Sequence, residues 1–374
     1  MPDRKKIVFI IPTMEGGGAE RTVSNLLRYL DRDKFRLSLV LYEKKVQYDI
    51  PADVKIFSLG VSPSPNFFIK AYNYALRIVK IAATLKNIKP DTVVSFLTDV
   101  NISTILAGFL SLSKSRLVIS ERNRIAAVYN IGYQKIKKFF VRFLYRYADK
   151  IIAVSEDISG ELTGCGIDRG KITVIHNMAD CKNIAVLSGD KITETNVFDG
   201  NAPVIVTAGS LTKQKNHALL LKAFKLVLEK MDAELLILGE GPLLAELESR
   251  ARALQIENKV TFAGFQKNPF KYISRSAIFV LSSLWEGFPN VLPEAFACGT
   301  PVICVDCGNI CRELVKDGVN GFIVPGHDSK LLAESIIRLL EDRVLLKELA
   351  GGAVAAAGEY DIEKGISRYE EALF

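Results

Sequence analysis

The sequence of 374 residues contains no uncharged apolar run of about 18 or more residues, the length that a membrane-spanning helix needs. Its start, MPDRKKIVFI, leads into an apolar stretch that stops at Pro12, so it lacks the long core and the small-residue cleavage site of a secretory signal. Without an export signal, the six cysteines are most simply reduced thiols. These absences predict a cytosolic protein without a membrane span.

Patterns typical of metal and dinucleotide sites are also scarce. Cys304, Cys307 and Cys311 have the spacing CxxCxxxC, but Cys304 falls in the middle of a predicted strand and no fourth ligand is evident nearby. We find no DxD-type pair of aspartates in a suitable loop. The first glycine-rich loop lacks the GxGxxG spacing of a dinucleotide site. We therefore expect neither a bound metal nor another cofactor.

The composition is that of an ordinary globular protein, with 49% apolar and 24% charged residues. The chain length predicts two domains, possibly three. Short apolar runs alternate with helical stretches, first over residues 6–177 and again over residues 203–325, which indicates two parallel sheets covered by helices. The expected domains are residues 1–180, a polar linker at 181–200, residues 201–358, and a C-terminal helix at 359–374.

Charge is unevenly divided between the two halves of the chain. Residues 1–180 carry 28 lysines and arginines against 17 acids, whereas residues 181–374 carry 21 against 25. An uneven positive charge of this kind favours an extended anionic partner. No nucleic-acid-binding motif accompanies it, so we do not expect nucleic acid.

The densest basic segment, residues 124–150, also contains aromatic residues at helical spacing. The pattern predicts an amphipathic helix with an apolar stripe on one side. Such a helix either packs its aromatic face in the core or lies in an anionic membrane interface, and the two alternatives stay open together. The basic residues proposed to meet a membrane or an acceptor are Lys135, Lys137, Lys138 and Arg142.

Three loops combine a position after a predicted strand with unusual residues. In an open α/β sheet, ligands bind beyond the carboxyl ends of the strands and against helix N-termini. The first loop, MEGGGAERT, places Gly16, Gly17 and Gly18 after the first strand, where a ligand can approach the backbone closely. A tight turn alone is the alternative explanation of these glycines.

The second loop is GSLTKQKNH, residues 209–217. Lys213 and Lys215 stand just before a helix, where a lysine opposes the helix dipole. We therefore expect an anion such as phosphate beside them. Solvated lysines are the alternative.

The third loop lies within residues 282–303 and carries two glutamates. Asn290 is the expected N-cap of a helix, and Pro293 falls in its first turn. Glu286 and Glu294 therefore flank a helix N-terminus whose amides can hold a phosphate. The alternative is that these glutamates are structural, with Glu294 only favouring the helix dipole.

Together these motifs resemble retaining glycosyltransferases of family 4, over essentially the whole chain. The most specific match is the E-x7-E element from Glu286 to Glu294 within EGFPNVLPEAFACGTPVI, and DGVNGFIVP is similar to a later family segment. SFLTDVNISTILAG and VISERN resemble transferases that extend undecaprenyl-diphosphate-linked glycans, including bacterial N-acetylgalactosamine transferases. The resemblance implies an α/β fold of the GT-B type, with two doubly wound parallel-sheet (Rossmann-like) domains facing across a cleft.

The resemblance also implies roles for individual residues. Lys215 would neutralise the diphosphate of a nucleotide-sugar donor, and Glu286 would contact hydroxyls of the transferred sugar, so these two are the implied catalytic residues. Glu294 would hold the ribose hydroxyls. The loop at Phe265 would face the base, expected to be uracil. The remaining implied donor contacts are Gly17, Gly18, Ser210, Gly287, Phe288, Pro289, Asn290 and Val291.

Two departures from the family pattern change these expectations. The second loop reads GSL instead of GRL, so Ser210 stands in place of an arginine and Lys215 would carry more of the phosphate neutralisation. Where many relatives have a catalytic-site histidine, this chain has Glu121 and Arg122, and none of its three histidines lies in that region. Glu121 and Arg122 are therefore the expected acceptor contacts.

The predicted function is retaining transfer of a sugar, an N-acetylhexosamine such as GalNAc or a hexose, from a UDP-sugar to a polyprenyl-diphosphate-linked glycan. The enzyme would serve surface polysaccharide or glycoprotein glycan assembly at the inner face of the cell membrane, without a metal. The leaving phosphate would help to deprotonate the acceptor. Two alternatives stay open: a cytosolic UDP-sugar sensor without turnover, and a glycosyltransferase with a soluble acceptor.

Overall fold

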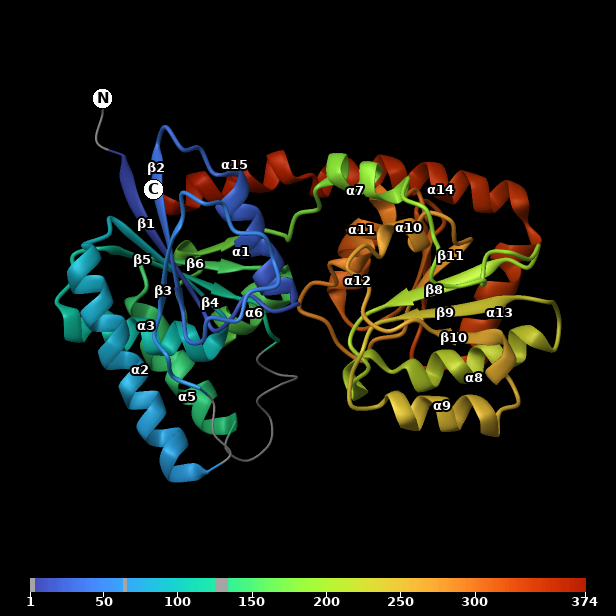
Figure 1. The fold of residues 1–374 in the computed structure, drawn as a ribbon, viewed down its shortest axis with the longest axis horizontal. Coiled ribbons are helices and arrows are strands. Elements are labelled where there is room, and N and C mark those ends of the chain that lie inside the picture. The colour runs from blue at the N-terminus through green and yellow to red at the C-terminus, as the bar shows by residue number, and fades with distance from the viewer. Residues whose placement is uncertain (1–3, 63–65, 125–133) are drawn as a thin grey trace. The chain divides into compact units, whose positions relative to one another are not determined.

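The computed structural model describes residues 4–62, 66–124 and 134–374 (Figure 1). The chain divides into two compact units. Unit 1 comprises Met1–Asn177 and Glu363–Phe374, and unit 2 comprises Met178–Ile362. Each unit contains one parallel sheet accompanied by helices, which confirms the predicted pair of doubly wound Rossmann-like domains.

Unit 1 contains a seven-stranded sheet in the order β3-β2-β1-β4-β5-β6-β7. Its central strands are short apolar runs that are buried along almost their whole length, as expected for a parallel sheet between helices. The edge strand β3 was not expected, because its four residues, KIFS, are all at least partly exposed and carry no clear pattern. The elements are β1 (Lys5–Ile11), α1 (Gly18–Tyr29), β2 (Phe35–Leu41), β3 (Lys55–Ser58), α2 (Phe67–Ile88), β4 (Thr92–Phe96), α3 (Thr98–Ser111), β5 (Arg116–Glu121), α5 (Gln134–Leu144), η1 (Tyr145–Tyr147), β6 (Lys150–Ala153), α6 (Glu156–Gly164), η2 (Arg169–Lys171) and β7 (Ile172–Val174).

Unit 2 contains a six-stranded sheet in the order β10-β9-β8-β11-β12-β13. Its core joins the apolar residues of these strands to the apolar faces of α8 and α13, with residues such as Phe224, Leu235 and Ile336 fully buried. The elements are α7 (Cys181–Ser188), β8 (Val204–Ala208), η3 (Lys213–Lys215), α8 (His217–Leu228), β9 (Glu234–Leu238), α9 (Leu244–Ala253), η4 (Glu257–Lys259), β10 (Val260–Phe262), α10 (Phe270–Ile273), β11 (Ile278–Leu281), α11 (Val291–Ala297), β12 (Val302–Val305), α12 (Asn309–Leu314), β13 (Gly321–Val324), α13 (Ser329–Glu341), α14 (Arg343–Ala357) and η5 (Gly358–Tyr360).

Several helices begin at residues whose side chains cap the first turn. The carboxylate of Asp342 accepts hydrogen bonds from the backbone N–H groups of Val344 and Leu345 at the start of α14. These bonds satisfy N–H groups that have no partner within the helix. Equivalent side-chain caps are made by Asn66 at α2, Ser155 at α6, Asp180 at α7 and Asp328 at α13.

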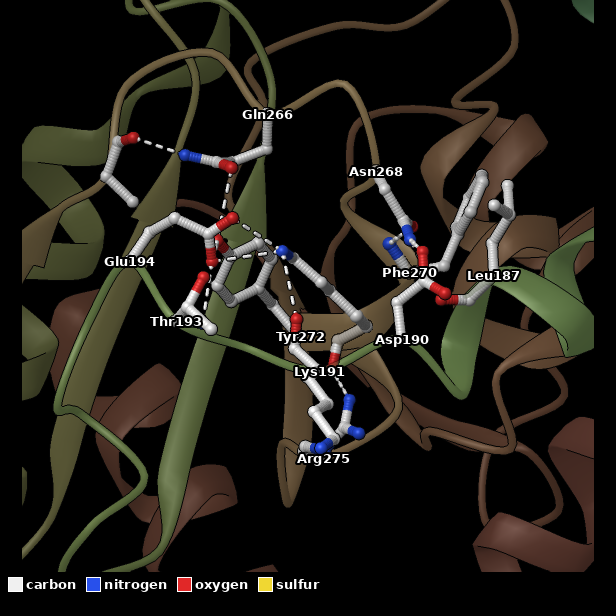
Figure 2. A network of polar contacts seen from close by, with 12 residues as sticks. Leu187, Asp190, Lys191, Thr193, Glu194, Gln266, Asn268, Phe270, Tyr272 and Arg275 are labelled. Carbon is white, nitrogen blue, oxygen red and sulfur yellow. Dashed lines mark hydrogen bonds and ion pairs between the residues drawn. The ribbon is translucent and has the colours of Figure 1, made fainter.

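Residues 181–200, expected as a linker, belong to unit 2. Figure 2 shows how this segment is held: the Glu194 carboxylate accepts hydrogen bonds from Lys271 Nζ at 2.7 Å and from Tyr272 Oη at 3.1 Å. Asn268 Nδ2 donates to Leu187 O and to the Asp190 carboxylate, each at 2.8 Å. Polar side chains on α10 and the preceding loop therefore hold the segment, and its own sequence shows little apolar periodicity.

The last residues of the chain belong to unit 1. They continue α15 (Ile362–Leu373) from Glu363 onward. The Phe374 ring stacks on the Phe35 ring with 5.2 Å between centroids, and Tyr369 is fully buried. The C-terminal segment therefore contributes both to the core of unit 1 and, through Tyr369, to the polar cluster described below.

Candidate active site

The strand order of both sheets reverses once along the chain. In unit 1 the reversal lies between β1 and β4, and in unit 2 it lies between β8 and β11. At such a reversal the loops after the two strands leave the sheet in opposite directions, so a crevice forms at their carboxyl ends and ligands bind there. The three loops predicted from the sequence follow β1, β8 and β11. The topology therefore places all three at a reversal point.

Glycine follows three neighbouring strands of unit 2: Gly209 directly after β8, Gly239 directly after β9, and Gly264 two residues after β10. All three have positive φ, with values of 153°, 140° and 67°. A Cβ atom on residue 239 would lie only 2.0 Å from the carbonyl oxygen of Gly209. The backbone at Gly239 therefore approaches that of Gly209 in a way that only glycine allows. Gly239 directly follows the apolar run of β9 in the sequence, but it was not predicted as part of the site.

Lys215 and Glu286 form an ion pair at this edge of the sheet. Lys215 Nζ lies 2.7 Å from Glu286 Oε1, and the two side chains are 17% and 7% exposed. Ser283 Oγ donates a second hydrogen bond of 2.7 Å to the same carboxylate oxygen. The sequence predicted an anion beside Lys215, and in the structure the Glu286 carboxylate of a neighbouring loop occupies that place.

The Lys215 loop and the Glu286 loop are joined by further hydrogen bonds. Ser282 Oγ donates to Lys215 O at 2.8 Å, and the Leu284 N–H donates to Gln214 O at 2.8 Å. Gln214 Nε2 in turn donates to Trp285 O at 2.9 Å. These contacts fix the backbone on both sides of the ion pair, so the positions of Lys215 and Glu286 are coupled.

Glu294 lies in the first turn of α11 and is 4% exposed. Asn290 precedes this helix as expected, but it has helical backbone angles and its side chain makes no capping hydrogen bond. Phe288 is largely buried, with its ring 6.1 Å from the ring of Tyr360. Gly287, Pro289 and Val291 complete the same loop and helix start, whereas Ser210 is exposed after β8.

Phe265 and Glu240 lie at the neighbouring strand ends. Phe265 follows β10 and is 58% exposed, so its ring is available for stacking. Its backbone N–H donates to Glu240 Oε1 at 3.3 Å, which ties the loops after β9 and β10 together. The position of Phe265 agrees with the base-facing role implied for this loop, while Glu240 was not singled out from the sequence.

His217 begins α8, two residues after Lys215, and was not predicted as a site residue. It is 2% exposed, and its Nδ1 atom is buried without a hydrogen-bond partner among the described residues. Burial, assisted by the charge of Lys215, lowers the pKa of His217 to about 4. The imidazole is therefore neutral at physiological pH and adds no charge to the site.

In unit 1, the glycine loop after β1 is closed by its own glutamate. A Cβ atom on Gly17 would lie 2.2 Å from Glu20 Oε2, so the glutamate folds back over the loop. Gly16 N–H donates to Gln47 Oε1 at 3.1 Å, and Tyr48 Oη donates to Gly17 O at 3.3 Å. Burial raises the pKa of Glu20, and the charge of Arg122 opposes this rise. Gly18 is the first residue of α1.

Glu121 does not reach the surface, which differs from its expected role as an acceptor contact. Its carboxylate is fully buried and accepts hydrogen bonds from Tyr145 Oη at 2.6 Å and from Thr98 Oγ1 at 2.9 Å. The backbone N–H groups of Arg122 and Asn123 donate to it at 3.0 and 3.1 Å. Burial raises the pKa of Glu121 despite these bonds. Glu121 therefore shapes the loop that carries Arg122.

Arg122 lies at the carboxyl end of β5, where its guanidinium has uncharged hydrogen-bond partners and acts electrostatically on the Glu20 carboxylate. Its guanidinium donates to Asn177 Oδ1 and, at 3.2 Å, to Tyr369 Oη, and it lies 5.3 Å from the centre of the Phe96 ring. Its Nε atom is buried without a hydrogen-bond partner among the described residues. A buried cation needs compensating charge or hydrogen bonds, and here Glu20 and the two neutral partners leave the Nε atom without an acceptor.

The predicted amphipathic helix is α5, and its aromatic residues face outward. Phe139, Phe140 and Phe143 are 56%, 41% and 42% exposed, whereas Val141 is fully buried. The alternative in which these three phenylalanines pack in the core therefore does not hold. The exposed surface formed by Lys138, Phe139, Phe140, Arg142, Phe143, Arg146 and Tyr147 is called the α5 surface below.

The backbone of α5 is described from Gln134, but the side chains of residues 134–137 lie outside the described part, including those of Lys135 and Lys137. Residues 125–133, part of the predicted basic segment, lie outside it entirely. Across residues 4–62, 66–124 and 134–374, no helix combines the length and the hydropathy that crossing a membrane requires.

Family models match both halves of the chain. The model for Glycosyltransferase Family 4 matches residues 16–183, and the model for glycosyl transferases group 1 matches residues 189–353. The first match contains the glycine loop, Glu121 and Arg122. The second contains Lys215, Glu286 and Glu294.

Two relatives in Campylobacter jejuni align with almost the whole chain. One, named N-acetylgalactosamine-N,N'-diacetylbacillosaminyl-diphospho-undecaprenol 4-alpha-N-acetylgalactosaminyltransferase, is 33% identical over 361 residues, which cover 96% of each chain. The other, an alpha-1,4-N-acetyl-D-galactosaminyltransferase named for a GalNAc-containing diNAcBac-PP-undecaprenol glycan, is 26% identical over 96% of this chain and 95% of its own.

Among solved structures, that of Anabaena HepE in complex with UDP-glucose matches 98% of this chain and 99% of its own, with 22% identity and a TM-score of 0.81. This match supports the fold. The 33% identity to the first Campylobacter relative shows the family, and the two family models together cover the reversal-point loops, Lys215 and Glu286. The chain therefore belongs to glycosyltransferase family 4 and is a glycosyltransferase with the GT-B fold.

Proposed function

We propose that this glycosyltransferase moves a sugar, an N-acetylhexosamine such as GalNAc or a hexose, from a UDP-sugar to a polyprenyl-diphosphate-linked glycan, with retention of anomeric configuration. Unit 2 would bind the donor and unit 1 the acceptor. The observation that supports this most directly is the Lys215–Glu286 pair at the glycine-lined strand ends of unit 2. The Campylobacter relatives, whose names give diphospho-undecaprenol glycans as acceptors, support the acceptor class.

In the proposed reaction, the bond between the anomeric carbon and the donor diphosphate breaks, and negative charge grows on the leaving phosphate. Lys215 stabilises that charge, since the loop that carries it is fixed to the Glu286 loop by hydrogen bonds. Binding of the diphosphate draws Lys215 away from Glu286. The freed Glu286 carboxylate then accepts hydrogen bonds from hydroxyls of the transferred sugar.

The remaining donor contacts follow from the same loops. Glu294, buried in the first turn of α11, would accept the ribose hydroxyls, and the exposed Phe265 ring would stack against uracil. The donor charge is met by a lysine and by backbone amides, so we propose that the reaction needs no metal. Treatment with EDTA should therefore leave turnover unchanged.

In unit 1, the proposed acceptor contact is Arg122. Its guanidinium is held in place by hydrogen bonds to Asn177 and Tyr369, and its Nε atom has no acceptor among the described residues. The diphosphate of the acceptor glycan supplies anionic oxygens to which this group can donate. Glu121, with its carboxylate occupied by four donor groups, positions the loop and does not contact the acceptor itself.

We also propose that the α5 surface holds the enzyme on the cytoplasmic face of an anionic membrane, where its lipid-linked acceptor resides. Exposed phenylalanines can enter the interface between headgroups and acyl chains, while Lys138, Arg142 and Arg146 attract anionic headgroups. The uneven charge of the chain favours the same surface, because the positive excess lies in residues 1–180.

The proposal is tested by incubating the purified enzyme with a panel of UDP-, GDP- and ADP-sugars and a synthetic prenyl-diphosphate glycan. Turnover with a UDP-sugar and an α-linked product, read from the anomeric NMR signals, is the expected result. A β-linked product contradicts retention. Binding of UDP-sugars without turnover favours a sensor, and equal turnover with an acceptor that lacks the prenyl diphosphate favours a soluble acceptor.

A further inference from the structure

Three cysteine sulfurs meet in the interior of unit 2, apart from the residues assigned above. Cys304 lies on β12, Cys307 in the loop that follows, and Cys311 on α12. Cys311 Sγ lies 2.9 Å from Cys304 Sγ and 3.1 Å from Cys307 Sγ. All six cysteines of the chain lie in its described part, and all six are thiols. The strand–loop–helix connection thus brings three thiols together around Cys311.

The surroundings of the three sulfurs give them different acidities. Hydrogen bonds from the two neighbouring thiols lower the pKa of Cys311. The pKa values of Cys304 and Cys307 are raised. For Cys307 the opposing contact with Cys304 is outweighed by the contact with Cys311 and by burial, with a smaller contribution to the rise in pKa from the Glu286 carboxylate. The two neighbouring thiols therefore favour the thiolate form at Cys311 over the other two positions. A thiolate is the reactive form of cysteine in oxidation and disulfide chemistry.

The distances favour sulfur–sulfur chemistry over metal binding. Thiolates that share a tetrahedral zinc ion lie about 3.8 Å apart, given zinc–sulfur bonds of about 2.3 Å. The two distances to Cys311 Sγ are shorter than this by more than half an ångström. In the described part of the chain, no group of three His, Cys, Asp or Glu side chains is placed to hold a metal ion. A disulfide needs sulfurs about 2.05 Å apart, so an approach of roughly 1 Å closes one.

We propose that Cys304, Cys307 and Cys311 form a redox-sensitive trithiol centre, in which Cys311 closes a disulfide with one of its two neighbours when it meets a hydroperoxide. The Cys311 sulfur attacks the peroxide, the O–O bond breaks, and a sulfenic acid and one water form from hydrogen peroxide. A neighbouring thiol sulfur then attacks the sulfenic sulfur. The S–S bond forms, and the sulfenic oxygen leaves as a second water with the thiol proton.

In this proposal, Cys307 links the centre to the Lys215–Glu286 pair. The Glu286 carboxylate is close enough to act on the Cys307 thiol electrostatically, and Cys307 is the most accessible of the three, at 5% exposed. Formation of a disulfide moves α12 toward Cys304 on β12, or moves the Cys307 loop toward α12. Either movement changes the surroundings of Glu286. The expected consequence, which rests on the proposed function, is weaker binding of UDP by the oxidised protein.

The test counts thiols after mild hydrogen peroxide treatment. Peroxide-treated and untreated protein is quenched, unfolded, alkylated and digested with trypsin. The mass of the peptide Ser276–Arg312, which contains the three clustered cysteines and Cys298, is then measured by mass spectrometry. We expect two alkyl groups on this peptide after peroxide and four before it, with a loss of two hydrogens that dithiothreitol reverses. Fragmentation should place the disulfide at Cys311. Four alkyl groups after peroxide overturn the proposal.

Two variants control the experiment. Cys298→Ser removes a cysteine of the same peptide outside the cluster and should leave the peroxide effect intact. Cys311→Ala should abolish it, and Cys307→Ser, which keeps the Cys304–Cys311 pair, gives a second variant if Cys311→Ala does not fold. A disulfide that still forms in folded Cys311→Ala overturns the central role of Cys311.

A thermal-shift titration with UDP separates this inference from the proposed function. Reduced protein should bind UDP, and oxidised protein should bind it several-fold more weakly, with dithiothreitol restoring the affinity. If reduced protein shows no UDP binding, the donor assignment fails. The alkylation count still shows whether the three cysteines form a disulfide. Equal UDP affinity in fully oxidised and reduced protein overturns the coupling to Glu286.

Discussion

The side chain of Lys215 runs over Gly209: a Cβ atom at position 209 would lie 3.1 Å from Lys215 Cε and 3.4 Å from its Cδ. Gly209 also has a φ of 153°, which disfavours other residues. Glycine at the end of β8 is therefore required both by the backbone and by the lysine that reaches Glu286. The contact makes the position of Lys215 open to a steric test.

Gly209→Ala should strain the backbone and push Lys215 by a few tenths of an ångström, and so lower turnover roughly 10-fold. Misplacement of a reacting group by about 1 Å can cost about 100-fold. Steady-state kinetics with the best UDP-sugar measures the effect. The matched control is Gly318→Ala, because Gly318 has a φ of 73° but nothing within 4 Å of its hypothetical Cβ. Gly318→Ala should lower stability and leave turnover near the wild-type value. Equal losses of activity in both variants would contradict the steric argument.

Lys215→Ala and Glu294→Ala should affect different kinetic constants. Loss of the lysine removes charge stabilisation in the transition state, so kcat should fall on the order of 100-fold or more. Loss of Glu294 removes a ground-state donor contact, so KM for the UDP-sugar should rise more than kcat falls. Lys213→Ala, which removes the exposed neighbouring lysine, is the control and should stay near wild type. If both variants change kcat and KM in the same way, Lys215 and Glu294 do not have the separate roles in turnover and donor binding assigned to them.

Glu121→Leu should destabilise unit 1 by about 3 to 5 kcal/mol, because it leaves the buried donors on Thr98, Tyr145, Arg122 and Asn123 unsatisfied. Glu121→Gln should cost less, about 1 to 2 kcal/mol, since the amide oxygen keeps the two backbone N–H donors and the hydroxyl groups can reorient. Urea unfolding measures both. If Glu121→Leu instead keeps full stability and loses only acceptor use, Glu121 is an acceptor contact after all.

His217 should make stability depend on pH in a defined window. Its folded pKa of about 4 lies below the ordinary value of 6.5, so the unfolded chain takes up a proton first and stability is lost as pH falls from 6.5 toward 4. Between pH 7 and pH 4 the loss is about 3 kcal/mol, from 1.36 kcal/mol per pKa unit. His217→Gln should remove this part of the acid sensitivity in urea unfolding at the two pH values. His327→Gln, at an exposed position, should not.

Lys138→Glu combined with Arg142→Glu should reduce binding to phosphatidylglycerol vesicles. Each basic residue near an anionic surface contributes about 1 kcal/mol, so reversing two charges should weaken co-sedimentation on the order of 10-fold or more at low salt. High salt should diminish the difference between variant and wild type. Lys330→Glu, an exposed lysine of unit 2, is the control. Unchanged co-sedimentation of the double variant would discard the α5 surface as the membrane contact.

The sequence by itself determined the alternation of strands and helices, the parallel sheets and the loops that carry the candidate site. These features depend on local patterns: an apolar run predicts a buried strand, and glycine or lysine directly after it marks a loop at the carboxyl end of the sheet. Lys215 was singled out by its place before a predicted helix, and Glu286 and Glu294 by their places around another helix start. The family resemblance came from the motifs that contain them. Edge strand β3, whose residues are partly exposed, carried too little pattern to be found.

Only the tertiary structure decided which groups these side chains meet. That Lys215 pairs with Glu286 depends on contacts between residues 71 positions apart, and the burial of Glu121 depends on Tyr145, 24 positions away. The local sequence around a charged side chain does not show whether it faces water, a ligand or a buried donor. Its burial depends on elements that are distant in the sequence. The same reason explains why aromatic residues of α5 lie exposed and why residues 181–200 belong to unit 2.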